Sequence, residues 1–184
     1  MQFFTSNLFF DNIKVSEDRH FKSVSDMNSL ILKNWNSLVV DTDKVYILGN
    51  IGNFDYLREL NGSKVLFLSE NDLTFFNKYI SSVSSERDDY YDKEMFELYC
   101  QSQYQVDHIT FSKKAVVNTF TNNLLRLTVD SVDGKNVLLN VYGGMGSYKK
   151  LERNTLNIDI LVNGYFPVSE VYIDSVIKYM KQYS

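Results

Sequence analysis

The sequence predicts an α/β protein in which two β-sheets pack together with helices on the outside. In the N-terminal half, short apolar runs alternate with helical patterns, as in parallel β/α units. The C-terminal half is mostly strand-like runs separated by turn residues, and it ends in one amphipathic helical pattern. The length of 184 residues and a hydrophobic content of 44% favour a single domain, residues 1–184, with a sizeable core.

The N-terminal half contains three predicted strands, at residues 2–5, 45–48 and 64–68. The run at 45–48 is entirely apolar and is followed by Gly49, which is typical of a strand covered on both faces. A polar loop is expected over residues 6–24.

Three helices are expected in this half of the chain. Ser25 is predicted to cap a helix that reaches residue 38, and residues 54–60 form a short helix ended by Asn61 and Gly62. Asp72 is predicted to cap a third helix.

Residues 89–105 mix acidic residues with tyrosines, and we expect them to be helical within a divergent helical segment at about 78–123. Two strand-like runs around Asp133-Gly134 predict a hairpin. A further strand begins near residue 156, a turn follows at Asn163-Gly164, and Ser169 is predicted to cap the final helix.

Composition excludes several classes of function. The net charge is −4 and no stripe of lysine and arginine is present, which argues against nucleic-acid binding. The single cysteine, Cys100, excludes an internal disulfide framework and a cysteine-rich zinc site. The N-terminus lacks the features of a signal peptide, and no run of about 18 apolar residues occurs. We therefore expect a cytoplasmic protein with no membrane partner.

Five segments of the sequence are informative together because of their order along the chain. They are "FFTSNLFFDN", "DKVYILGNIG", "YLRELNGSKVLFLSEND", "VLLNVYGGMG" and "LNIDILVNGYFPVSEVYIDSV". In order and spacing they resemble the calcineurin-like metallophosphoesterases, in particular the small bacterial and phage branch. The resemblance covers nearly the whole chain and is weakest between Lys78 and Asn123. It implies a two-sheet β-sandwich flanked by helices, in αββα layers, and the host-cell cytoplasm if a phage encodes the chain.

The resemblance also implies a metal site whose ligands are missing here. In the family, aspartates, histidines and an asparagine hold two divalent ions that activate water. The matching positions are Asn7, Phe9, Asn50, Glu70, Asn71, Tyr142, Gly144 and Gly146. Amides alone bind transition metals poorly. The resemblance with these substitutions implies no catalytic residue, no metal and no other cofactor.

Asparagine in place of a bridging aspartate has a physical reason. Without a cation, two carboxylates 4 Å apart repel by about 4 kcal/mol at an effective dielectric constant near 20. Asn50 keeps the shape and the hydrogen bonding while it removes that charge. Phe9, an aromatic ring in a ligand position, is expected to fill the cleft.

The expected function is that of a catalytically inactive metallophosphoesterase-fold protein that binds a macromolecular partner as a scaffold or inhibitor. Tyr90 and Tyr91 in the acidic segment, and Phe9 and Phe10 at the cleft mouth, are the candidate partner-binding residues, because aromatic residues are enriched at interface hot spots. The carboxylates around Tyr90 predict a protein partner with a basic surface.

The same residues are compatible with two alternative functions. One is a protein that binds a nucleotide or another phosphate compound through Asn7, Asn50, Asn71 and backbone amides. The other is a residual phosphodiesterase that holds one hard cation with Asp11, Glu70 and Asp72.

Overall fold

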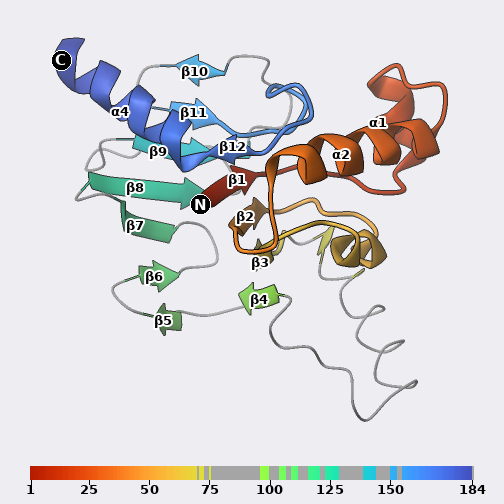
Figure 1. Ribbon diagram of the computed structural model, residues 1–184, viewed down its shortest axis with the longest axis horizontal. Coiled ribbons are helices and arrows are strands. Elements are labelled where there is room, and N and C mark those ends of the chain that lie inside the picture. The colour runs from red at the N-terminus through yellow and green to blue at the C-terminus, as the bar shows by residue number, and fades with distance from the viewer. Residues whose placement is uncertain are drawn as a thin grey trace.

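The structure is a computed structural model and describes residues 1–69, 71–72, 75, 96–99, 104–106, 109–111, 116–120, 123–128, 139–143, 150–152 and 155–183. Its elements form an α/β fold with a five-stranded and a seven-stranded sheet (Figure 1). The α/β class is therefore confirmed. Within the described residues, no helix has both the length and the apolar character needed to cross a bilayer.

The five-stranded sheet has the order β12-β1-β2-β3-β4, with β1 to β4 parallel and β12 antiparallel to β1. The three strands predicted in the N-terminal half are confirmed to within one residue. The strands are β1 (Gln2–Thr5), β2 (Lys44–Leu48), β3 (Ser63–Phe67), β4 (Phe96–Tyr99) and β12 (Val168–Ser169).

Two hydrophobic clusters cover the two faces of this sheet. Val45 and Ile47 of β2 belong to one cluster, together with Trp35 and other residues of the N-terminal helices. Tyr46 and Leu48 belong to the other, which also contains residues of the C-terminal helix and of the seven-stranded sheet. The alternation confirms that β2 is a strand covered on both faces.

The helices differ in detail from the prediction. The expected loop at 6–24 contains a short helix capped by Asn12. The next helix is capped by Ser23, whose Oγ accepts a hydrogen bond from Asp26 N at 3.1 Å. The predicted cap, Ser25, therefore lies inside this helix. Ser169 is confirmed as a cap, because its Oγ accepts from Tyr172 N at 3.3 Å. The elements are α1 (Ile13–Asp18), α2 (Val24–Leu38), the 3-10 helix η1 (Phe54–Arg58) and α4 (Glu170–Tyr183).

The seven-stranded sheet has the order β10-β11-β9-β8-β7-β6-β5. Figure 1 shows α4 beside β9, β11 and β12, on the opposite side of the molecule from α1. The strands are β5 (Tyr104–Val106), β6 (Ile109–Phe111), β7 (Val116–Phe120), β8 (Asn123–Thr128), β9 (Leu139–Tyr142), β10 (Leu151–Glu152) and β11 (Thr155–Asn157).

The predicted helical segment at about 78–123 is wrong where the structure describes it. β4 pairs in parallel with β3, and β5 to β7 pair with one another. Tyrosine and phenylalanine favour strands when a neighbouring sheet edge is available for pairing. The edge of β3 is far away in sequence, so the local pattern could not show it. The remainder of the segment lies outside the described residues.

The predicted hairpin around Asp133-Gly134 is also wrong. β8 and β9 are neighbours, but they pair in parallel, with Leu125 opposite Leu139. Alternating side chains have the same period in parallel and antiparallel strands, so the pattern identified the strands and not their relative direction.

Lys64 is a buried cation on β3, and its burial predicts how stability depends on pH. It is 3% exposed, its Nζ donates to the carbonyl of Leu60, and burial lowers its pKa from 10.5 to about 8. The unfolded chain therefore binds more protons than the folded chain between pH 8 and 10.5, and the free energy of unfolding contributed by this group rises across that window.

The measurement compares the melting temperature of the protein with that of Lys64→Met from about pH 7 to about pH 10. The difference is expected to shift in favour of the wild type as the pH rises. A difference that does not change with pH would contradict the prediction.

Candidate functional site

The candidate site is built from the loops that follow β1 and β2. These loops contain an unusual number of left-handed backbone conformations, with φ of 58° at Asn7, 54° at Phe9 and 60° at Asp11, and 69° at Gly49 and 53° at Asn50. Asparagine and aspartate adopt this left-handed region more readily than other side chains, whereas for Phe9 it costs on the order of 1 kcal/mol. Residues held in this region gather at functional sites.

Backbone hydrogen bonds hold the two loops side by side. Asn7 N donates to Gly49 O at 3.2 Å, and Phe9 N donates to Asn50 O at 2.9 Å. The contact leaves no room for a side chain at Gly52, where a Cβ atom would lie 2.3 Å from the carbonyl oxygen of Phe10. The strained conformations are therefore locked by the pairing of the loops.

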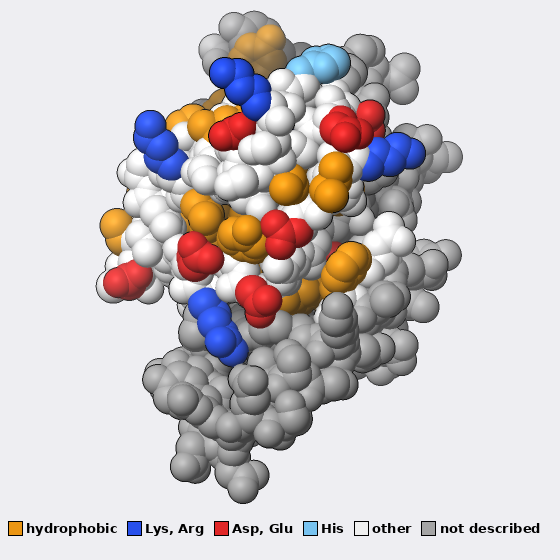
Figure 2. Space-filling view, turned by 90° about the vertical axis from the view of Figure 1, so that its right-hand side faces the viewer, with side chains coloured by type: hydrophobic (Ala, Val, Ile, Leu, Met, Phe, Trp, Pro, Cys, Tyr) orange, Lys and Arg blue, Asp and Glu red, His pale blue; other side chains and the backbone are white. Residues whose placement is uncertain are grey.

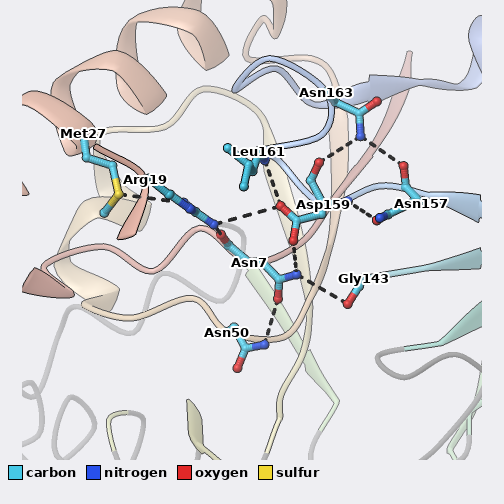
Figure 3. A network of polar contacts seen from close by, with 9 residues as sticks. All are labelled: Asn7, Arg19, Met27, Asn50, Gly143, Asn157, Asp159, Leu161 and Asn163. Carbon is cyan, nitrogen blue, oxygen red and sulfur yellow. Dashed lines mark hydrogen bonds and ion pairs between the residues drawn. The ribbon is translucent and has the colours of Figure 1, made fainter. Parts of the chain in front are cut away.

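The side chain of Asn7 lies at the centre of a polar network (Figure 3). It is fully buried, its Nδ2 donates to Asp159 Oδ2 at 2.6 Å and to Gly143 O at 3.4 Å, and its Oδ1 accepts from Asn50 Nδ2 at 2.7 Å. Ser69 Oγ lies 3.2 Å from Asn50 Oδ1. Both polar atoms of the Asn7 amide are therefore bonded inside the protein.

Asp159 and Arg19 form a buried ion pair beside Asn7. Arg19 Nη2 lies 4.0 Å from Asp159 Oδ1, and each side chain is 6% exposed. Burial raises the pKa of Asp159 and lowers the pKa of Arg19, and the attraction between them opposes both shifts. The guanidinium also donates to Asn7 O at 2.9 Å and lies 5.5 Å from the ring centre of Phe9. Arg19 therefore ties α1 to the loop that follows β1.

Asp72 has a different role from the predicted helix cap. Its carboxylate accepts from the backbone amides of Asn50, Ile51 and Ser69 at 2.7, 2.7 and 2.8 Å, and from Ser69 Oγ at 2.6 Å. Asp72 itself lies within a helical turn, and its backbone amide donates to Ser69 Oγ at 3.3 Å. Because Asp72 is 1% exposed, it is an internal anion that organises the loop after β2.

A cleft with a volume of about 870 Å³ opens next to these loops. It is lined by residues of the loop after β1, of η1 and of the region around Asp72. Phe9 is half-buried and lines the cleft. Phe10 also lines the cleft but is only 1% exposed, because its ring stacks on Tyr56, and it offers little surface to a partner.

The structure brings some of the sequence-predicted residues together. Asn7 and Asn50 are hydrogen-bonded, and Asn71 is exposed at the cleft. Tyr142 ends β9, next to Gly143. The other predicted positions, Glu70, Tyr90, Tyr91, Gly144 and Gly146, lie outside the described residues.

Sequence reasoning missed Arg19 and Asp159. Asp159 carried a signal, since it is a lone charged residue between Ile158 and Ile160 in an apolar run, and such a charge needs a buried partner. Arg19 carried none, because it lies in a polar stretch and its partner is far away in the chain.

Within the part of the chain that the structure describes, no group of three or more His, Cys, Asp or Glu side chains is placed to hold a metal ion. Of the three residues considered for a single hard cation, Asp72 directs both oxygens at backbone amides, and Glu70 lies outside the described residues.

Comparison with known proteins shows a shared fold. No protein-family model and no curated protein matches the chain. Among solved structures, the fold is similar to that of AQ665 from Aquifex aeolicus, described as a protein of unknown function, with a TM-score of 0.60 and 18% identity over 96% of this chain and 98% of that chain. At this identity the likeness concerns the fold alone.

Proposed function

We propose that this chain is a metallophosphoesterase-like protein, with its two sheets packed as a sandwich between helices, that has no phosphoesterase activity and acts by binding a macromolecule. The hydrophobic cluster that contains Tyr46 and Leu48 of one sheet and Val141 and Leu156 of the other supports the sandwich. The resemblance in sequence supports the family.

The observation that carries the proposal is the bonding of Asn7. At the position where the family has a metal-binding aspartate, the amide donates to Asp159 and accepts from Asn50. The positive charge beside Asp159 comes from Arg19, at 4.0 Å. This internal network supplies the contacts that a metal ion would otherwise make to these residues.

The strained loops after β1 and β2 support a role in binding for the part of the cleft that they line. Phe9 keeps a left-handed conformation although this costs on the order of 1 kcal/mol, and Asn7 and Asp11 on either side of it adopt the same region. Loops without left-handed residues would make the fold more stable. The strain therefore favours a role in binding for the surface that these loops form.

The phosphate-binding alternative has less support. The amides of Asn50 and Ile51, which would receive an anion, are already bonded to Asp72 at 2.7 Å each. In addition, none of the described cleft-lining residues is lysine or arginine, whereas Asp11 and Asp55 both line it. This lining favours a cation over a phosphate.

The proposal predicts no metal-dependent turnover. Purified protein is expected to contain less than about one tenth of an equivalent of Mn, Fe, Zn or Ni, and added Mn²⁺ is expected to give no hydrolysis of bis-p-nitrophenyl phosphate, since no group in the network is free to activate water. Elemental analysis and a colorimetric assay measure the two outcomes.

The matched control is Asn50→Ala, which removes an amide from the same network. Turnover that copurifies with the protein and disappears in this variant would contradict the proposal. Turnover of equal rate in both proteins would identify a contaminating phosphatase.

A further inference from the structure

The cleft beside the strained loops has an acidic and aromatic lining. Asp11 and Asp55 are exposed, and the described lining residues include no lysine, arginine or histidine. Phe75 is 52% exposed and Ile13 is 64% exposed. Figure 2, which looks at the side of the molecule that carries α1, shows acidic and hydrophobic side chains next to one another.

The carboxylate of Asp11 is held in place by neutral groups. Oδ1 accepts from Asn28 Nδ2 at 2.7 Å and from the hydroxyl of Tyr56 at 3.1 Å, and Oδ2 accepts from Asn53 Nδ2 at 2.7 Å. These donors fix the orientation of the carboxylate without cancelling its charge. Within the described part of the chain, no lysine or arginine forms an ion pair with Asp11.

Asn53 links the two acidic residues of the cleft. Its Nδ2 donates to Asp11, and its Oδ1 accepts from the backbone amide of Asp55 at 3.0 Å, which is the capping bond of η1. Asn53 therefore orients the Asp11 carboxylate directly and fixes the backbone of Asp55 at the start of a helical turn. Holding the Asp11 carboxylate in advance reduces the entropy lost when a cation binds.

We propose that this cleft binds an arginine side chain, flanked by apolar residues, of a protein partner. The inference rests on the proposed function, because it names the kind of partner that the non-catalytic protein takes. A guanidinium bonds to carboxylates through several N–H groups and stacks on aromatic rings, and the cleft offers both kinds of surface. A volume of about 870 Å³ exceeds what one side chain needs and suits a short peptide segment.

The test uses ¹⁵N-labelled protein and the capped peptide Gly-Phe-Arg-Phe-Gly. The peptide is expected to shift the amide resonances of Asp11, Asn53 and Asp55. The same peptide with citrulline, a neutral isostere of arginine, is expected to bind at least about tenfold more weakly. Equal binding of both peptides would overturn the proposal, as would equal shifts caused by spermine, which would indicate a general acidic surface.

Variants locate the binding site. Asp55→Asn is expected to weaken binding of the arginine peptide by at least about threefold and to leave binding of the citrulline peptide unchanged. Asp18→Asn removes the same charge from an exposed position on α1 outside the cleft lining and is expected to have no effect. Equal losses in both variants would show that only net charge matters and would overturn the assignment.

The outcome separates this inference from the proposed function. If the peptide does not bind while turnover is absent and a partner is captured from cells, the proposed function stands and the partner does not use this cleft. If metal-dependent turnover is found, the proposed function fails whatever the peptide does.

Discussion

Asp72→Asn is expected to lower the free energy of unfolding by roughly 3 kcal/mol or more. The carboxylate of Asp72 accepts four hydrogen bonds, three of them from the backbone amides of Asn50, Ile51 and Ser69. In the variant an NH₂ group replaces one acceptor oxygen, so at least one buried amide faces another donor. A buried donor without an acceptor costs about 1–3 kcal/mol, and a hydrogen bond to a charged group contributes about 1.5–3 kcal/mol.

Thermal and denaturant unfolding measure this loss. For a chain of this length, each kcal/mol corresponds to a shift in melting temperature of about 2–4 °C, so a drop of roughly 6–12 °C is expected. The control is Asp55→Asn, which makes the same chemical change at an exposed position and is expected to stay within about 0.5 kcal/mol of the wild type. Equal stability of the two variants would show that Asp72 does not organise the loop.

Asn7→Asp restores the aspartate that the family resemblance implies, and it is expected to destabilise the protein strongly. The new carboxylate replaces an amide whose Nδ2 lies 2.6 Å from Asp159 Oδ2. Two carboxylates 4 Å apart, with no added cation, repel by about 4 kcal/mol at an effective dielectric constant near 20, and the pair created here would lie closer than that. The melting temperature is expected to fall by roughly 8–16 °C at neutral pH.

The loss is expected to depend on pH. One of the two carboxyl groups keeps its proton in the folded variant, so its folded pKa lies above the unfolded value. The folded state then binds more protons than the unfolded state, and the stability of the variant falls as the pH rises through the folded pKa. Melting temperatures at about pH 4.5 and about pH 7.5 should therefore differ more for the variant than for the wild type.

Asn12→Asp is the matched control for this prediction. It adds the same charge a few residues away, at the N-cap of α1, where an aspartate accepts the hydrogen bond from Val15 N as well as asparagine does. It is expected to change stability by no more than about 0.5 kcal/mol. A variant Asn7→Asp as stable as Asn12→Asp would mean that Asp159 is not charged next to Asn7, and the account of the network would be wrong.

The local sequence determined the elements whose signals lie within a few residues of one another. The apolar run ended by Gly49 predicted the buried strand β2, because a strand with both faces covered has no polar face. Ser169 predicted the start of α4, because a cap acts on amides two or three residues away. The absence of a carboxylate or an imidazole at Asn7, Phe9 and Asn50 could likewise be read directly from the sequence.

The tertiary structure alone decided features that depend on partners far away in the chain. The edge of β3 made Phe96–Tyr99 a strand instead of a helix, and the parallel pairing of β8 with β9 replaced a predicted hairpin. Neither outcome has a local signal, because the alternation of side chains does not encode which strand becomes the neighbour or in which direction it runs.

The polar network of the site was decided in the same way. The resemblance in sequence implies a metal ligand at the position of Asn7, but only the fold showed that Asp159 and Arg19 lie beside it and that Asp72 binds the amides of the loop after β2. A buried charge requires a partner, and the apolar residues on both sides of Asp159 in the sequence indicate that its charge is buried. Which residue meets it depends on how the loops come together, and that is set by the packing of the whole chain.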